Sequence, residues 1–258
     1  MKEGKKLKKR KKSSLLFRFI KYFVRLFSPK MKISGTESLP DEPCIIIGNH
    51  SQLYGPIACK LYLPESTYTW CAHEMMELRE VPAYAFADFW SQKPKAQQPF
   101  FKAASYLIAP LSVVIFNNAR TVPVYKDNRT LSTLKETVKR LCGGQSIVIF
   151  PEHDKKHNHI VYDFLEGFVD VARLYYKRTG KEISFVPMYV CPKLEKVCFG
   201  TPIKFSAEAP LEDERRRICG ALMDSITELA EALPYHTVVP YRNIPKRLYP
   251  KNKQKEQK

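Results

Sequence analysis

The segment "CIIIGNH" (44–50) joins a short apolar run to a glycine, an asparagine and a histidine. Four consecutive apolar residues before such a turn predict a strand that is buried on both faces, as in a parallel sheet. Similar runs follow at 121–125 (TVPVY), 146–150 (SIVIF), 183–190 (ISFVPMYV) and 196–200 (KVCFG). Helical patterns lie between or after these runs, at 131–144, 163–180 and 211–233.

This alternation predicts an α/β fold with a mostly parallel sheet flanked by helices. At 258 residues the chain is long enough for one large domain with a substantial core. In such sheets the functional residues gather on loops at the carboxyl ends of strands. His50 follows the first run and "PEHDKKHNH" (151–159) follows the run at 146–150, so both are predicted at that edge.

The net charge of +17 lies entirely in the two ends of the chain. Residues 1–30 carry twelve Lys or Arg and one Glu, and residues 242–258 carry seven and one. The residues between them balance, which argues against a specific nucleic-acid-binding surface. We therefore expect a disordered basic tail over 1–12, a folded domain over 31–241 and a second basic tail over 242–258.

Residues 13–30 predict an amphipathic helix that lies on a membrane surface. Arg18, Lys21 and Arg25 form a narrow basic stripe, and the remainder of the segment is largely aromatic or aliphatic. With the polybasic run before it, such a helix suits an anionic membrane. The alternative is a helix that packs its apolar face on the domain. The later run 103–116 has 14 apolar or small residues and contains Pro110, which is short for a membrane span.

The seven cysteines are odd in number and lack any CxxC spacing, which indicates a reduced, cytoplasmic compartment and no disulfide framework. Cys59 and Cys71 have no activating neighbours in the sequence and are expected to pack in the core. We thus expect a cytoplasmic protein that associates peripherally with a membrane.

Five ordered blocks resemble the glycerolipid and lysophospholipid acyltransferases. They are "NHSQLYGP" (49–56), "TVPVYKD" (121–127), "IVIFPEHDKKHN" (147–158), "ISFVPMYV" (183–190) and "FGTPIKF" (199–205). The resemblance implies the fold of that family and transfer of an acyl group from an acyl thioester to the hydroxyl of a lysophospholipid or related acceptor. The implied donor is acyl-CoA or acyl carrier protein, with no further cofactor and no metal.

The resemblance also implies roles for individual residues. His50 would act as general base on the attacking hydroxyl. Glu152 would orient loops or acceptor hydroxyls. The acceptor's phosphate would be held by basic residues of the second and third blocks, namely Lys126, Arg129, Lys155 and Lys156.

The sequence departs from the family at Gly55, where the first block normally has the aspartate that orients the histidine. Asp154 and Glu74 are candidates for that orienting role. Two alternatives remain open. One is a catalytically silent lipid-binding protein on the same fold, and the other is a metal-dependent enzyme that uses His153, His157 and their neighbours in 153–159.

Overall fold

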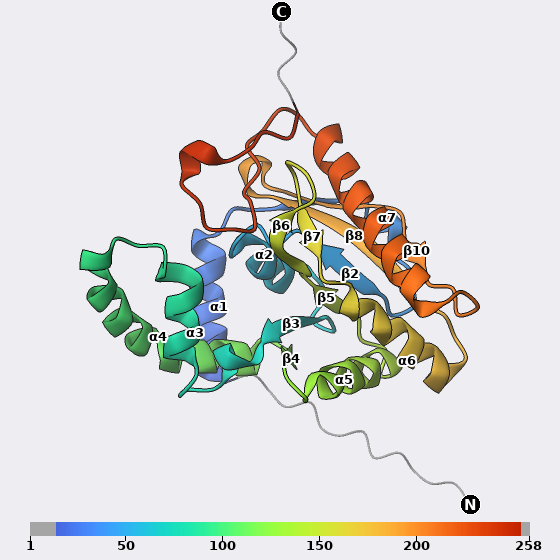
Figure 1. The fold of residues 1–258 in the computed structure, drawn as a ribbon, viewed down its shortest axis with the longest axis horizontal. Coiled ribbons are helices and arrows are strands. Elements are labelled where there is room, and N and C mark those ends of the chain that lie inside the picture. The colour runs from blue at the N-terminus through green and yellow to red at the C-terminus, as the bar shows by residue number, and fades with distance from the viewer. Residues whose placement is uncertain (1–13, 254–258) are drawn as a thin grey trace, which may run out of the picture.

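The computed structural model describes residues 14–253, whose strands form an eight-stranded sheet and a two-stranded one (Figure 1). The order in the large sheet is β1-β9-β8-β2-β5-β3-β4, with β10 beside β8. The strands are β1 (Lys32–Ser34), β2 (Ile45–Gly48), β3 (Tyr68–Ala72), β4 (Thr121–Val124), β5 (Ile147–Ile149), β6 (Glu152–Lys156), β7 (Tyr162–Phe164), β8 (Ser184–Cys191), β9 (Lys196–Phe199) and β10 (Ile203–Lys204). The helices are α1 (Leu15–Phe27), α2 (Tyr54–Tyr62), α3 (Val81–Ala85), α4 (Gln98–Asn118), α5 (Thr130–Cys142), α6 (Asp170–Thr179) and α7 (Leu211–Ala232).

Strand β2 lies at the centre of the large sheet. It pairs in parallel with β5 on one side and β8 on the other, so that Ile46 lies opposite Val148 and Val186. All four residues of β2 are buried. The continuous apolar run in the sequence is explained by this position, because helices cover both faces of the strand.

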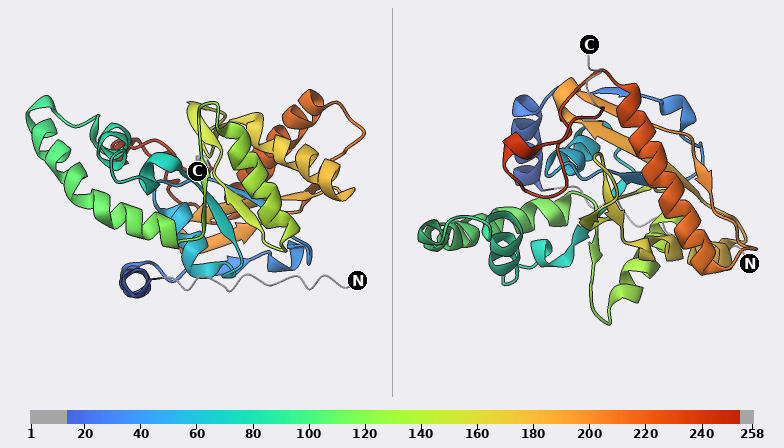
Figure 2. Two further views of the ribbon diagram at one scale, coloured as in Figure 1. Left: turned by 90° about the horizontal axis from the view of Figure 1, so that it is seen from below. Right: turned by 45° about the horizontal axis from the view of Figure 1, so that its top comes forward.

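The two faces of the sheet pack against different helices. Ile45 and Ile47 share one core cluster with buried residues of α5, α6 and α7. Ile46 points to the other face, where Ala58 and Cys59 of α2 complete a second cluster. This alternation follows from the two-residue period of side chains along a strand. Figure 2 shows the sheet between these helices from two further directions.

The fold class predicted from the sequence is confirmed: the architecture is α/β, with a mostly parallel sheet flanked by helices. The exceptions lie at one side, where β8 pairs antiparallel with β9 and β10. Residues 151–159, expected as a loop, instead form much of a hairpin of β6 and β7. The expectation failed because this polar segment shows no alternation of apolar and polar residues.

A large insertion between β3 and β4 contains α3 and α4 and has its own small core around Val81, Ala85 and Ala109. Helix α4 is longer than the apolar run in the sequence. Within the described part of the chain, the segment Lys95–Asn118 is long and apolar enough to cross a membrane by length and composition. Several large side chains of α4 are exposed, including Phe100, Tyr106 and Leu107.

Helix α1 packs against α4, and its apolar face is turned away from the domain. Phe17 is its buried residue, and Lys21 forms an ion pair with Glu65 that ties the helix to the body. The large exposed side chains are Leu15, Leu16, Phe19, Tyr22, Phe23, Leu26 and Phe27. The alternative in which α1 buries this face on the domain is therefore contradicted.

The chain after α7 returns to the domain, which differs from the loosely held tail expected from residue 242. Asn252 is completely buried, and Thr237 forms an isolated antiparallel bridge with Lys251. Composition misleads here because four prolines and several basic residues surround the few contacts that hold the segment. The tail expected over 1–12 and residues 254–258 lie outside the described residues.

Candidate active site

The residues singled out in the sequence gather at the carboxyl edge of the parallel strands. His50 follows β2, Glu152 follows β5, and Lys126 and Arg129 follow β4. His73, which had no motif around it, follows β3 at the same edge and is buried. Because these strands run parallel, their ends place all of these side chains on one side of the sheet.

Glu152 holds the loop that carries His50. Its Oε2 accepts a hydrogen bond from the backbone N–H of His50 at 2.5 Å, and its Oε1 accepts one from Tyr162 at 3.0 Å. Burial raises the pKa of this carboxyl group to about 7, against the lowering effect of the two N–H donors. Both oxygens are thus occupied by main-chain groups, and Glu152 fixes the backbone of the site.

The imidazole of His50 lies between two aromatic rings. Its centroid is 5.2 Å from that of Phe150 and 5.9 Å from that of Tyr241, and both contacts are edge-on. Its Nδ1 is buried and has no hydrogen-bond partner within residues 14–253. Burial lowers the pKa of His50, opposed by backbone groups of Gln52 and of His50 itself. The ring is therefore neutral near pH 7, as a general base requires.

Neither carboxylate proposed to orient His50 does so. Asp154 is exposed and lies 3.7 Å from Arg242, while Glu74 lies 3.1 Å from His73. Both residues come from the same edge of the sheet, but their side chains face other partners. The sequence identified Asp154 and Glu74 as candidates for the orienting role, but it could not show whether their side chains contact His50.

Gly55 is required by the backbone. A Cβ at this position would lie 2.6 Å from the carbonyl oxygen of His50, 2.9 Å from Cε1 of Phe150 and 3.0 Å from the carbonyl oxygen of Asn49. The N–H of Gly55 instead donates to the His50 carbonyl at 3.1 Å. The start of α2 therefore closes tightly onto the histidine and leaves no space for the side chain of an aspartate.

The turn after His50 is strained. Ser51 and Gln52 have φ values of +48° and +54°, in the left-handed region that residues other than glycine seldom adopt. Asn49 ties the turn to β8. Its Nδ2 donates to the carbonyl of Val190 at 3.1 Å, and its Oδ1 accepts from the N–H of Val190 at 2.7 Å. Such strain persists only where the surroundings hold it in place.

Arg129 lies close to the edge but is already engaged. Its guanidinium bonds both oxygens of Asp127, stacks 4.2 Å from the ring of Tyr125, and lies 3.1 Å from Nε2 of His73. The side-chain hydrogen bond of Arg129 lowers the pKa of Asp127 to about 2. Lys126 is exposed and acts electrostatically on Asp88. Each basic residue of the second block therefore interacts with an acidic residue, Arg129 with Asp127 and Lys126 with Asp88.

The basic residues of the third block lie on the β6–β7 hairpin. Lys155 and Lys156 are exposed, and Lys155 lies 3.4 Å from Asp163. His157 faces Asp163 and Asp224, at 3.8 and 3.7 Å. Between residues 14 and 253 no group of three or more His, Cys, Asp or Glu side chains is placed to hold a metal ion.

The cysteines considered as nucleophiles lie in apolar surroundings. Cys59 is buried, and burial raises its pKa well above the ordinary value. Burial raises the pKa of Cys71 to about 12. Both thiols are therefore protonated at neutral pH and poor nucleophiles.

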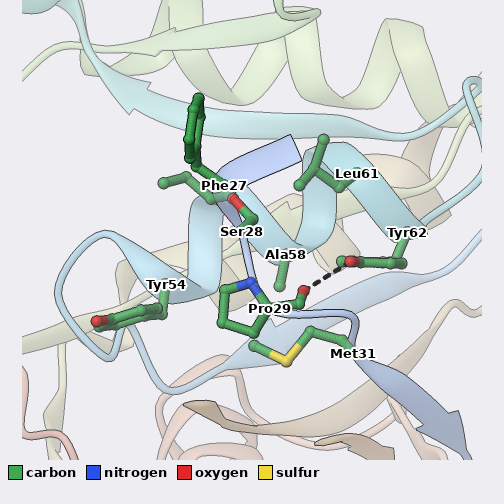
Figure 3. Close-up of a pocket in the computed structure, with 9 residues that line it drawn as sticks. Phe27, Ser28, Pro29, Met31, Tyr54, Ala58, Leu61 and Tyr62 are labelled. Carbon is green, nitrogen blue, oxygen red and sulfur yellow. Dashed lines mark hydrogen bonds between the residues drawn. The ribbon is translucent and has the colours of Figure 1, made fainter. Parts of the chain in front are cut away.

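An apolar pocket lies between the end of α1 and α2 (Figure 3). The Tyr62 hydroxyl donates to the carbonyl of Pro29 at 2.7 Å and closes one side. Tyr54, which directly precedes Gly55, lines another part. The remaining walls are apolar apart from Ser28 and include Phe27, Met31, Ile57, Ala58 and Leu61. The lining thus comes from the end of α1, the segment that follows it, and α2.

Sequence reasoning missed Asn49, His73 and Tyr241. His73 carried a usable signal, because it directly follows an apolar strand in the manner of His50. Tyr241 carried none, since it lies in a segment whose composition resembles a tail.

No family model matches the chain, and no curated protein matches it. The fold is similar to the crystal structure of the 1-acyl-sn-glycerophosphate (LPA) acyltransferase PlsC from Thermotoga maritima, at 15% sequence identity and a TM-score of 0.47. The match covers 85% of this chain and 81% of that one. At this degree of similarity, function has to be inferred from the residues of the site.

Proposed function

We propose that the protein transfers an acyl group from an acyl thioester to a hydroxyl of a lysophospholipid or related acceptor at a membrane surface. The observation that carries the proposal is the neutral, partly buried imidazole of His50 on a loop that Glu152 fixes through the backbone.

In the proposed reaction, His50 takes the proton of the acceptor hydroxyl as its oxygen attacks the thioester carbonyl. Because Nδ1 is buried, Nε2 is the ring nitrogen left for the proton. The C–S bond then breaks, the new ester C–O bond remains, and the imidazolium returns the proton to the leaving thiolate. The donor is acyl-CoA or acyl carrier protein, and Lys126, Arg129, Lys155 and Lys156 are proposed to contact the acceptor head group.

Mass-spectrometric detection of acylated product tests the proposal. Purified protein is mixed with anionic vesicles, a panel of lysolipids and both thioester donors, beside a His50→Ala variant. Product that requires His50 supports acyl transfer. Absence of product above the variant across the whole panel would refute it.

The second candidate function is lipid binding without turnover on the same fold. It is favoured by one observation, the lack of any hydrogen-bond partner for Nδ1 of His50 within residues 14–253. Vesicle binding by a wild-type protein that yields no product in the same assay would support this alternative.

Membrane association is proposed to involve α1 and α4 together, on the cytoplasmic side. Phe19 is 61% exposed and Leu107 is 82% exposed, on helices that pack against each other. Phe19→Glu and Leu107→Glu variants are expected to bind anionic vesicles more weakly in a sedimentation assay, since each places a charge in the apolar interface. Leu131→Glu is the matched control, because Leu131 is exposed on α5, away from both helices in Figure 1. An equal loss in the control would refute a role specific to α1 and α4.

A further inference from the structure

The segment from Pro240 to Pro250 is a compact loop whose ends meet. The N–H of Val238 donates to the carbonyl of Pro250 at 2.9 Å, and Thr237 bridges to Lys251 next to this contact. Loops that close on themselves in this way are Ω-loops, which are frequently functional. We call residues 240–250 the C-terminal loop.

Asn252 locks the base of the C-terminal loop. Its Oδ1 accepts from the N–H of His236 at 2.8 Å, and its Nδ2 donates to the carbonyl of Ala230 at 2.8 Å. The backbone N–H of Asn252 returns a bond to the carbonyl of His236 at 3.1 Å. One fully buried side chain thus joins the end of α7 to both ends of the loop.

The C-terminal loop contacts the loop that carries His50, the insertion and the β6–β7 hairpin, where the ring of Tyr241 lies 5.7 Å from that of Tyr162. The hydroxyl of Tyr249 accepts a hydrogen bond at 2.8 Å from Nε2 of Gln52, which lies two residues after His50. Asn243 donates to the carbonyl of Phe89 in the insertion at 3.3 Å. Tyr241, two residues before Asn243, brings its ring to 5.9 Å from that of His50.

The imidazole needs a source of orientation. No side chain provides it through a hydrogen bond to Nδ1, because Nδ1 has no such partner in residues 14–253 and Gly55 leaves no room for a carboxylate; backbone groups of Gln52 and of His50 itself lie near the ring. The side chains that contact the ring edge-on are Phe150 and Tyr241, and both centroid distances are typical of favourable aromatic pairs. Phe150 comes from the sheet, whereas Tyr241 comes from the C-terminal loop.

We propose that Tyr241 is a positioning residue, which holds the imidazole of His50 in place by ring packing where the family uses a carboxylate. The role rests on the proposed function, since it concerns the general base of that reaction. The Tyr241 ring also keeps water from the imidazole, so its removal is expected to change the proton affinity of His50 as well as its orientation.

The charged groups around the pair come from several elements. Glu152 faces His50 from β6 and contacts its backbone N–H. Burial raises the pKa of Tyr241, and the charges of Asp88 in the insertion and Asp154 on β6 raise it further. Arg242 on the same loop lowers it. Within this set, burial raises the pKa of Glu152 to about 7 and lowers that of His50.

The test compares Tyr241→Ala with Tyr241→Phe in the full-length protein. The imidazole signal of His50 is followed by NMR against pH, with a His50→Ala sample to assign it. Tyr241→Ala is expected to raise the pKa of His50 toward its ordinary value and to lower kcat by about 10- to 100-fold, since a misplaced base costs this much. Tyr241→Phe keeps the ring, and both quantities are expected to stay near those of the wild type.

Asn243→Ala is the matched control, because Asn243 lies on the same loop and its side chain bonds the carbonyl of Phe89 and makes no contact with the ring of His50. Tyr241→Leu serves in place of Tyr241→Ala where the smaller residue prevents folding. A folded Tyr241→Ala or Tyr241→Leu variant with the wild-type pKa at His50 would overturn the proposal, as would equal effects in the Asn243→Ala control. A wild-type protein without turnover refutes the proposed function alone, since the titration still reports on the positioning of the ring.

Discussion

An aspartate at position 55, as in the acyltransferases that the first sequence block resembles, is expected to destabilise the protein. The new Cβ would lie 2.6 Å from the His50 carbonyl oxygen and would force that carbonyl away from the N–H of residue 55. Overpacking of this kind costs about 1–3 kcal/mol. Loss of the backbone hydrogen bond adds about 1 kcal/mol. The better helix propensity of alanine returns about 1 kcal/mol, so Gly55→Ala is expected to cost about 1–3 kcal/mol.

Gly55→Asp carries a further cost. Its carboxylate would enter a buried position beside the carbonyl oxygens of His50 and Asn49, which offer no hydrogen-bond donor. An unsatisfied polar group adds about 1–3 kcal/mol, which brings the loss of unfolding free energy to about 2–6 kcal/mol. In a protein of this size each kcal/mol lowers Tm by about 2–4 °C, so the loss is measurable by thermal unfolding.

The matched control is Gly220→Ala in α7, where a Cβ would have no neighbour within 4 Å. It is expected to stabilise the helix by up to about 1 kcal/mol. Urea unfolding of the three variants beside the wild type, followed by the acyl-transfer assay, completes the experiment. A Gly55→Asp protein that is as stable as the wild type and turns over faster would refute the reasoning, because the turn would then have space for the missing carboxylate.

Three other predictions concern charged and buried polar groups. The pKa of Glu152 is raised to about 7, so its contribution to stability is full below pH 4.5 and is lost as the pH rises through about 7. The free energy of unfolding, measured against pH, should fall by up to about 3 kcal/mol over this range, and Glu152→Gln should flatten the slope. An unchanged slope in Glu152→Gln would show that another group dominates the profile. Asp127→Asn releases Arg129, so the KM for a phosphomonoester acceptor should fall while that for a neutral acceptor stays constant; equal changes in both would contradict the electrostatic explanation. Asn252→Ala removes four side-chain hydrogen bonds and should cost about 1–3 kcal/mol with faster proteolysis at 240–250; unchanged cleavage there would show that the loop is held by other contacts.

The elements predicted best from the sequence are the buried ones, because burial requires apolar residues and these form recognisable runs. Strands β2, β5 and β8 are nearly continuous apolar runs because helices cover both faces of the sheet. The β6–β7 hairpin was missed because its residues are polar and solvent-exposed on one strand. The packing of residues 242–253 was missed because one asparagine provides much of its attachment, and a single residue leaves no pattern in a basic, proline-rich segment.

The candidate site was predicted in part. The position of His50 at the end of a buried strand follows from the sequence alone. The reason for Gly55 does not, since it lies in the approach of two backbone segments. The pairing of Arg129 with Asp127 was within reach, because the two residues are close in the sequence and their charges are opposite. Tyr241 lies nearly two hundred positions from His50, and its contact exists only in the folded chain.

The central place of β2 has a consequence for how the chain acquires its structure during synthesis. Residues 45–47 pair with residues 147–149 and 185–187, so the strand that carries His50 emerges long before either neighbour exists. Until residues 147–149 have been made, "CIIIG" has unpaired backbone groups on both sides, and one side stays unpaired until residues 185–188 follow. Such an apolar segment promotes association between chains. Because His50 follows the central strand, the site can form only after a slow step in which the chain is exposed to aggregation.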